Sequence, residues 1–403
     1  MKNKTVHSKN SVPSAKLVLK DGTEFAGKSF GANCSIAGEV VFATGMVGYP
    51  EALTDPSFRG QILVMTYPLI GNYGVPKKEL WESKKMQVAG LIVSSYIDDY
   101  SHHAAKESLS EWLKKEKVPA IEVKDTRFLT QKLRDEGVSL GKIIANGKDL
   151  LFVDPNTRNL VAEVSTKEIL YFGKKDTSGE RTVVLIDCGE KQNMVRRLVA
   201  RGLYVAMVPW DTDVLKLKFP FKAVIVSNGP GDPKKAEATI NNVKKILDKK
   251  IPTLGICLGN QILALASGGT TFKMKFGHRS QNQPAVESGT NKCYLTTQNH
   301  GFAIKKIPAG FKEWFYNAND GTNEGIIHKS LPFMSVQFHP ESSPGPLDTD
   351  WIFDYFLQKS GVVKARGYAR RRSHSVLGEQ DRFGRSEGSS GHTPELFAKN
   401  YEK

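Results

Sequence analysis

A cysteine that follows an apolar strand pattern and opens a helical one is the most reactive arrangement in this sequence. Residues 255–261 read GICLGNQ, with Cys257 at the junction. A side chain on such a strand-to-helix turn projects at the carboxyl end of the sheet, where open α/β sheets bind ligands. Gly255 and Gly259 would let neighbouring backbone pack where a Cβ would clash. The N–H of Leu258 would face a developing oxyanion. The spacing predicts a nucleophile, although this motif alone also fits a small buried cysteine in a tight turn.

A histidine with an acid close behind it supplies the base that a thiol nucleophile needs. Residues 335–341 read SVQFHPE, so His339 follows a buried-strand pattern and Glu341 comes two residues later. Histidine can accept and return a proton, and a carboxylate can fix its tautomer. A lone histidine beside proline is more often a turn residue. Together with the upstream cysteine, the pattern indicates a catalytic set of Cys257, His339 and Glu341.

The elements that position these residues form two α/β domains, as a length of 403 residues leads us to expect. In the second domain, short apolar strands alternate with helical patterns, which is typical of a doubly wound, mostly parallel sheet. The first domain reads as mixed α/β, and it includes a helix at residues 104–113. We expect a basic tail at 1–15, the first domain at 16–147, a connecting segment at 148–181, the second domain at 182–360, and a basic, disordered tail at 361–403.

Composition excludes several classes of protein. No apolar run approaches the roughly 20 residues needed to cross a bilayer, which argues against a membrane protein. The net charge of +15 is high, but much of it lies in the two tails, so a nucleic-acid partner is disfavoured. The four cysteines form no C-x-x-C pair, which disfavours a structural zinc site or a disulfide framework. No metal ligands are assigned to this chain.

The same features predict a cytoplasmic location. Widely spaced cysteines fit a reducing compartment, and the N-terminus has no apolar core of a secretory signal. The first fifteen residues are basic and free of acids, as in organelle transit peptides. They lack the bulky apolar face of such a helix, so a frayed tail is the preferred interpretation, with organellar targeting left open.

Residues 182–357 resemble the class I, triad-type glutamine amidotransferases. The resemblance rests on GICLGNQ and FHPE, and it assigns Cys257, His339 and Glu341 as nucleophile, base and orienting acid. Two further segments match the family, SNGPGDP at 227–233 and QNHGF at 298–302. The resemblance implies that L-glutamine is bound by residues of these two segments and of the strand-to-helix turn at Cys257, which we call the elbow: Gly229, Gly231, Leu258, Gln261, Asn299, Gly301 and Phe302. The N–H groups of Leu258 and Gly229 would form the oxyanion hole, and His300 is interpreted as structural.

The N-terminal domain narrows the resemblance to the small subunits of carbamoyl-phosphate synthetases. Residues 44–57 (TGMVGYPEALTDPS) and 66–74 (TYPLIGNYG) are similar to the domain peculiar to that family. Ser57 matches a residue of this domain that reaches the glutamine site, although from first principles it is only a serine in a turn. Asn260 stands where the family often has histidine, at a helix position that we expect to face the surface.

The resemblance implies that the chain releases ammonia from glutamine for a separate large subunit. That partner would make carbamoyl phosphate from bicarbonate and two ATP. No G-x-x-x-x-G-K-[ST] motif is present, so ATP and a divalent metal are expected on the large subunit and no cofactor on this chain. Two alternatives are a catalytically silent scaffold and the glutaminase of another synthase, such as anthranilate or guanylate synthesis. Arginine and pyrimidine pathways both stay open.

Overall fold

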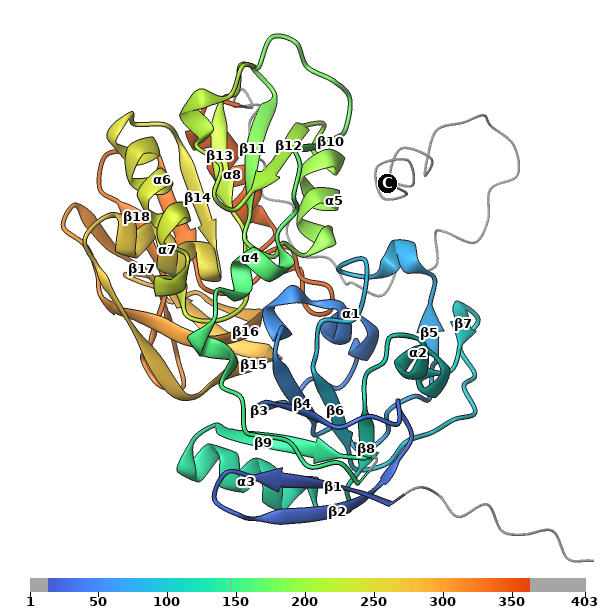
Figure 1. The fold of residues 1–403 in the computed structure, drawn as a ribbon. Coiled ribbons are helices and arrows are strands. Elements are labelled where there is room, and N and C mark those ends of the chain that lie inside the picture. Colours follow the sequence, from blue (N-terminus) through green and yellow to red (C-terminus); the bar gives the residue numbers. More distant parts are fainter. Residues whose placement is uncertain (1–13, 146, 363–403) are drawn as a thin grey trace, which may run out of the picture.

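The computed structural model describes residues 14–145 and 147–362, which form two α/β domains side by side (Figure 1). The first strand begins at Ser14, two residues before the predicted start of the first domain. The remainder of both predicted tails, residues 1–13 and 363–403, lies outside the described residues. Within the described ranges, no helix combines the length and the apolar character that crossing a membrane requires.

The N-terminal domain is built on a closed barrel of mixed parallel and antiparallel strands. Around the barrel the strands are β1 (Ser14–Leu19), β2 (Glu24–Ser29), β8 (Ala120–Glu122), β6 (Gly90–Val93), β4 (Gln61–Met65), β3 (Ile36–Ala43) and β9 (Ser139–Ile144). Its helices are α1 (Tyr49–Thr54), α2 (Leu109–Lys115) and α3 (Thr126–Glu136). Alternate residues of β4 face opposite ways: Ile62 joins the cluster that α3 completes, and Leu63 joins the cluster under α1 and α2.

The helix predicted at residues 104–113 is shorter and starts later. Residues Ala105–Glu107 form β7, which pairs with β5 (Val75–Pro76). The side chain of Ser108 then accepts a hydrogen bond from the N–H of Glu111, and Glu111 bonds back to Ser108, so a capping box fixes the start of α2 at Leu109. The prediction missed this boundary because the apolar spacing continues across it.

The C-terminal domain holds a ten-stranded sheet whose central part is parallel. In order across the sheet the strands are β10 (Leu170–Phe172), β12 (Tyr204–Pro209), β11 (Thr182–Asp187), β13 (Ala223–Val226), β14 (Thr253–Ile256), β19 (Phe333–Val336), β18 (Asn323–His328), β17 (Phe311–Asn317), β15 (Thr270–Glu287) and β16 (Cys293–Lys306). Neighbours from β12 to β19 are parallel, whereas β10 and the strands from β18 to β16 are antiparallel. The predicted fold class is confirmed, with a sheet that is mixed rather than mostly parallel.

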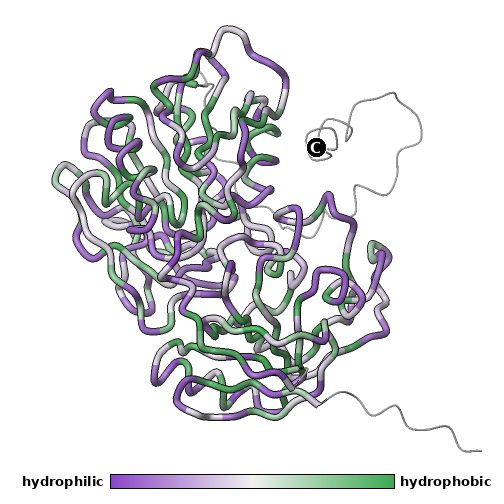
Figure 2. The backbone as a smooth tube through the Cα atoms, in the orientation of Figure 1, coloured by the Kyte–Doolittle hydropathy of each residue, from purple (hydrophilic) through white to green (hydrophobic). Residues whose placement is uncertain are grey.

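Helices cover both faces of the parallel strands, as a doubly wound sheet requires. Val183 and Leu185 of β11 pack with α5 (Gln192–Ala200) and α8 (Trp351–Lys359). Val184 and Ile186 of the same strand pack on the opposite side with α6 (Glu237–Asp248) and α7 (Leu258–Ala266). Figure 2 shows the apolar residues gathered along these strands. Both faces are therefore buried, which explains the continuous apolar runs in the sequence.

The predicted connecting segment, residues 148–181, carries structure of its own. It contains α4 (Leu160–Val164) and β10, which extends the large sheet antiparallel to β12. Val161 and Phe172 are buried in the core of the C-terminal domain. These elements are too short to leave a periodic pattern in the sequence. The segment thus crosses from one domain to the other while packed against both.

Candidate active site

Cys257 sits at the tight turn between β14 and α7. Its φ of 54° is in the left-handed region, where a residue other than glycine is strained. Its side chain is 1% exposed, its backbone N–H donates to the carbonyl of Val336, and its Sγ lies 3.7 Å from the carbonyl oxygen of Asn299. Leu258 is the first residue of α7, so its N–H has no acceptor within the helix and is directed out of the helix N-terminus. The geometry is that of a nucleophile on an elbow.

The two glycines around the elbow are required by close backbone contacts, as predicted. A Cβ on Gly255 would lie 2.3 Å from the carbonyl oxygen of Gly259, and one on Gly259 would lie 2.1 Å from that of Val226. Neither contact involves a flexible side chain that could move aside. The turn can therefore form only with glycine at both positions.

His339 and Glu341 follow β19 and form a buried pair beside the elbow. His339 Nδ1 lies 2.6 Å from Glu341 Oε1, and the two side chains are 1% and 0% exposed. His339 Nε2 is buried without a hydrogen-bond partner among the described residues. Since the carboxylate occupies Nδ1, the nitrogen that remains for chemistry at Cys257 is Nε2.

The charges around this pair favour an imidazolium on His339. Burial opposes a charge there, but the carboxylate of Glu341 and the sulfur of Cys257 outweigh it and raise the pKa of His339 to about 10. Burial likewise disfavours charge on Glu341, yet His339 and Lys191 together lower the pKa of its carboxyl. The ammonium of Lys191 lies 3.6 Å from Glu341 and donates to the carbonyl of Ser342. Sequence reasoning missed Lys191, which lies near the start of the domain whereas Glu341 lies near its end.

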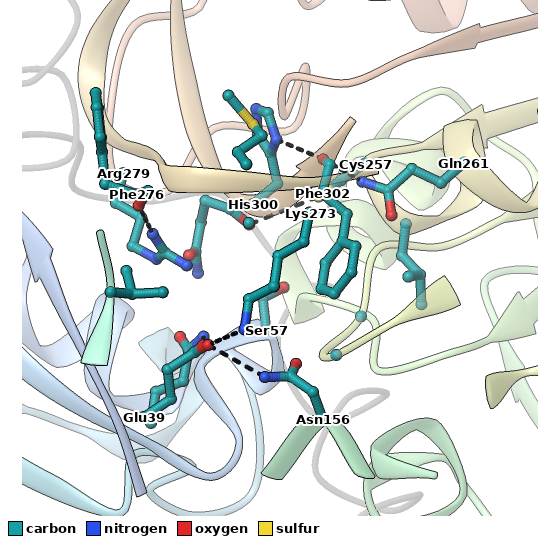
Figure 3. Close-up of a pocket in the computed structure, with 18 residues that line it drawn as sticks. Glu39, Ser57, Asn156, Cys257, Gln261, Lys273, Phe276, Arg279, His300 and Phe302 are labelled. Carbon is teal, nitrogen blue, oxygen red and sulfur yellow. Dashed lines mark hydrogen bonds and ion pairs between the residues drawn. The ribbon is translucent and has the colours of Figure 1, made fainter. Parts of the chain in front are cut away.

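A cavity in front of Cys257 brings together every residue that the sequence assigned to glutamine binding (Figure 3). These residues come from four separate segments: Ser57, Gly229, Gly231, Leu258, Gln261, Asn299, Gly301 and Phe302. His339 is not on this wall but lines a second, adjoining cavity together with residues of both domains. Cys257 thus faces a space for a substrate, with its histidine on the side of the second cavity.

Ser57 shows how the N-terminal domain completes the cavity. Asp55 caps the turn that carries Ser57 by accepting from its N–H, and it also accepts from the side chain of Asn299 at 3.0 Å. The hydroxyl of Ser57 accepts a hydrogen bond of 3.0 Å from Asn228. Two segments of the C-terminal domain therefore hold this turn of the N-terminal domain in place.

Gln261 offers an unused acceptor to the cavity. Its side-chain nitrogen donates to the carbonyl of Phe302 at 2.8 Å and lies 3.1 Å from the side-chain oxygen of Gln337. Its Oε1 is buried and has no partner among the described residues. A buried acceptor of this kind calls for a donor, which a carboxamide N–H could supply.

The prediction that Asn260 faces the surface is wrong. Asn260 is 0% exposed, donates to the side chain of Gln337 at 3.0 Å and accepts from Ser335 at 2.7 Å. Gln337 in turn donates to the sulfur of Cys257 at 3.6 Å. Helix α7 is packed against strands of the sheet and against α6, so its polar residue Asn260 is buried as well. Gln337 itself could have been found from its spacing, since it lies two residues before His339.

A buried polar network lies behind the cavity around His300. Its Nδ1 contacts the carbonyl of Phe302 at 2.9 Å, and its Nε2 contacts the side-chain oxygen of Gln298 at 3.1 Å. Burial lowers the pKa of His300 well below its usual value, with the charge of His278 as a further cause. His278, His300 and Glu324 lie close enough to one another to hold a metal ion. However, the ring nitrogens of His278 and His300 already have protein partners. We therefore interpret the cluster as structural, which is also the role predicted for His300.

Comparison with known proteins assigns each domain to a family. Residues 184–359 match the family Glutamine amidotransferase class-I, and residues 17–143 match the Carbamoyl-phosphate synthase small chain, CPSase domain. The first match covers the elbow, the pair of His339 and Glu341, and most of the ten-stranded sheet. The fold and the site thus define a glutamine amidotransferase of class I joined to a second, more specific domain.

Relatives from several organisms match both domains together. The chain is 45% identical over 370 residues to the carbamoyl phosphate synthase arginine-specific small chain of Aspergillus niger, covering 88% of this chain and 81% of that protein. The protein of the same name from Neurospora crassa is 45% identical over 373 residues, covering 89% and 82%. The mouse mitochondrial carbamoyl-phosphate synthase [ammonia] is 49% identical over 365 residues, covering 88% of this chain.

The chain belongs to the carbamoyl-phosphate synthase small-chain family. It spans about a quarter of the length of the mouse protein, with 24% of that protein covered. The predicted resemblance is therefore confirmed at the level of the family.

Proposed function

We propose that this chain hydrolyses L-glutamine and delivers the ammonia to a large subunit that makes carbamoyl phosphate. The observation that carries the proposal is Cys257 on its strained elbow, facing a cavity, with the buried pair of His339 and Glu341 behind it. The alternative of a silent scaffold has no support from this arrangement. The alternative of another synthase is disfavoured because the N-terminal domain matches the carbamoyl-phosphate synthase small chain.

The first half of the reaction forms a thioester. The thiolate of Cys257 attacks the carboxamide carbon of glutamine, and the carbonyl electrons move onto an oxyanion that accepts from the N–H groups of Leu258 and Gly229. The imidazolium of His339 gives its Nε2 proton to the amide nitrogen as the carbon–nitrogen bond breaks. Ammonia leaves, and the γ-glutamyl group stays on sulfur.

The second half releases glutamate. Neutral His339 takes a proton from water, the water oxygen attacks the thioester carbon, and the carbon–sulfur bond breaks to restore the thiolate and the imidazolium.

The ammonia must leave without being protonated in solvent. The second cavity beside His339 suits such a path because residues of both domains line it. Val47, which lines this cavity, is 59% exposed and its chain neighbour Met46 is 65% exposed, as an apolar contact with a protein partner would require.

The partner that we propose supplies the remaining chemistry. Bicarbonate, two ATP and a divalent metal would be bound by the large subunit, and this chain would need no cofactor for the thioester steps above. The four cysteines, Cys34, Cys188, Cys257 and Cys293, are free. Free thiols fit a reducing compartment, so we propose that the complex works in the cytoplasm.

Mass spectrometry of the full chain quenched during glutamine turnover tests the proposal. We expect a γ-glutamyl adduct on the peptide that contains Cys257, because the thioester is an obligatory intermediate of this mechanism. Incubation with L-glutamate in place of glutamine serves as the control for non-enzymatic labelling. A chain that binds the large subunit but shows neither adduct nor release of glutamate would be a scaffold.

The elbow glycine Gly259 gives a prediction about geometry. We expect Gly259→Ala to reduce glutamine hydrolysis about 10²-fold, because the new Cβ pushes on the carbonyl of Val226 and displaces the turn that aims Cys257. The free energy of unfolding should fall by about 1–3 kcal/mol. Steady-state glutaminase assays and chemical denaturation measure the two effects. Gly321→Ala is the control for activity: its φ of 73° strains an alanine and should lower stability, but no atom lies within 4 Å of the added Cβ, so glutamine hydrolysis should be kept.

A further inference from the structure

Glu82 is a buried carboxylate of the N-terminal domain whose side chain bonds to the C-terminal domain. It lies between the short 3-10 helix η2 (Lys78–Leu80) and β6, and it is 0% exposed. Its Oε1 accepts a hydrogen bond of 2.6 Å from the hydroxyl of Ser343 and one of 3.1 Å from Nη1 of Arg196. Its Oε2 accepts from the backbone N–H of Asn193 at 2.9 Å. A buried carboxylate is costly without such partners, and all three belong to the other domain.

These contacts make Glu82 the cap of helix α5. Lys191, the residue at the N-cap position of α5, gives the helix no side-chain hydrogen bond. Instead, Gln192 donates its N–H to the backbone carbonyl of Glu82 at 2.9 Å, and Asn193 donates its N–H to the carboxylate. The first N–H groups of a helix have no acceptor within it, and a negative charge is favoured beside them. The first turn of α5 is therefore fixed by a residue of the N-terminal domain.

The first turn of α5 also holds the segment that carries the orienting acid. The side chain of Asn193 donates to the backbone carbonyl of Glu341. The next two residues, Ser342 and Ser343, have φ values of 60° and 57°, in the left-handed region that residues other than glycine rarely adopt. Such a backbone keeps its shape only where its surroundings hold it. Glu82 reaches this segment by two routes, through Asn193 and through Ser343.

Glu82 is anchored within its own domain as well. Its N–H donates to the side-chain oxygen of Thr54 at 3.0 Å, and the hydroxyl of Ser83 donates to the carbonyl of Thr54 at 2.6 Å. Thr54 is the last residue of α1 and is 0% exposed. The position of the carboxylate is therefore set by a buried part of the N-terminal domain.

We propose that Glu82 is a positioning residue for the glutaminase reaction, because it holds the backbone of Glu341 where the carboxylate meets Nδ1 of His339. The strength of that hydrogen bond depends steeply on its distance and angle. Glu82 does not line the cavity in front of Cys257, so substrate binding should not depend on it. The inference rests on the glutaminase function proposed above, and it assigns to the N-terminal domain a part in arranging the catalytic set.

A double-mutant cycle on the full chain tests this role. We expect Glu82→Gln to slow single-turnover formation of the glutamyl adduct on Cys257 about fivefold at saturating L-glutamine. The reason is that the amide has one acceptor atom, whereas Ser343 and Asn193 require two. The L-glutamine concentration for the half-maximal rate should stay within about twofold of the wild-type value. In the Glu341→Gln background, Glu82→Gln should cost less than about twofold, since the carboxylate that it positions is gone.

The pH profile of adduct formation is a second readout of the same role. Although burial opposes it, Glu341 and Cys257 raise the pKa of His339, which sets the alkaline limb. A displaced Glu341 raises this pKa less, so the limb should move to lower pH in Glu82→Gln, by less than in Glu341→Gln. Lys191, which also faces Glu341, is unchanged in every variant. A merely structural loss would lower the rate without moving the limb.

Glu79→Gln is the matched control, because Glu79 is an exposed carboxylate of the same segment and its backbone contact with Arg196 is kept. It should match the wild type in rate and in pH profile. If Glu82→Gln does not fold, Ser343→Ala removes one of the two routes and takes its place in the cycle. For either variant, an equal loss of rate with and without Glu341→Gln, or no loss at all, would overturn the inference. A wild-type chain that forms no glutamyl adduct would instead overturn the proposed function, and the inference with it.

Discussion

Replacing Cys257 with serine should abolish carbamoyl phosphate synthesis from glutamine while leaving synthesis from added ammonia intact. The hydroxyl of serine is a far weaker nucleophile than a thiolate, and His339 with Glu341 is arranged around a sulfur. We expect glutamine-dependent turnover to fall by about 10⁴-fold or more. The ammonia-dependent reaction needs only the chemistry of the large subunit. The measurement is the rate of carbamoyl phosphate formation by the assembled complex with each nitrogen source in turn.

The exposed thiol of Cys293 provides the control, since Cys293→Ser makes the same replacement at a residue that does not line the cavity. That variant should behave as wild type with both nitrogen sources. Equal losses with glutamine and with ammonia in Cys257→Ser would contradict the prediction. They would mean that Cys257 maintains the fold or the contact with the large subunit.

The elbow and its base could be predicted because their signals are local. An apolar strand that stops at Cys257 and a helix that begins at the next residue fix where the sulfur points, and the flanking glycines report backbone contacts that the structure contains. His339 follows its strand in the same way. Parallel neighbours bring both strand ends to one edge of the sheet, so β14 and β19 place Cys257 and His339 together.

The antiparallel part of the C-terminal sheet could not be predicted with the same tools. Strands β15 and β16 are long and interrupted by register shifts, so alternation along them is broken. The position of Arg279 on the cavity wall depends on that pairing and on the N-terminal domain, which closes the cavity. The error at Asn260 has a related cause: α7 is buried around its circumference, and a polar residue there satisfies Gln337 and Ser335 instead of meeting water.

Ser57 illustrates the same limit across domains. Ser57 and Asp55 lie on one turn, whereas their partners Asn228 and Asn299 are far from that turn in the sequence. The two contacts therefore depend on how the two domains pack. A serine in a turn carries no periodic signal that could announce this. The resemblance to a family supplied the assignment, and the structure places Ser57 on the cavity wall.

The second large effect is expected at the base. His339→Asn should slow thioester formation about 10³-fold, because the protonated imidazole gives the departing ammonia its proton. Glu341→Gln should cost about 10²-fold less than His339→Asn, because the carboxylate orients and charges the imidazole without itself moving a proton. Single-turnover formation of the glutamyl adduct on Cys257 measures both variants without interference from the second half of the reaction.

The pH dependence of the Glu341→Gln variant tests the roles separately. Although burial opposes it, the charge of Glu341 is the strongest influence that raises the pKa of His339 to about 10. Thioester formation requires the protonated imidazole, so in the wild type it is lost only as pH rises through that value. Without the carboxylate the pKa of His339 falls, and the alkaline limb of the profile must move to lower pH. Glu180→Gln, at an exposed carboxylate of the same domain, should leave the limb in place. An alkaline limb that does not move in Glu341→Gln would mean that the titrating acid is not His339. In the single-turnover experiment, a larger loss of rate for Glu341→Gln than for His339→Asn would reverse the assignments of base and orienting acid.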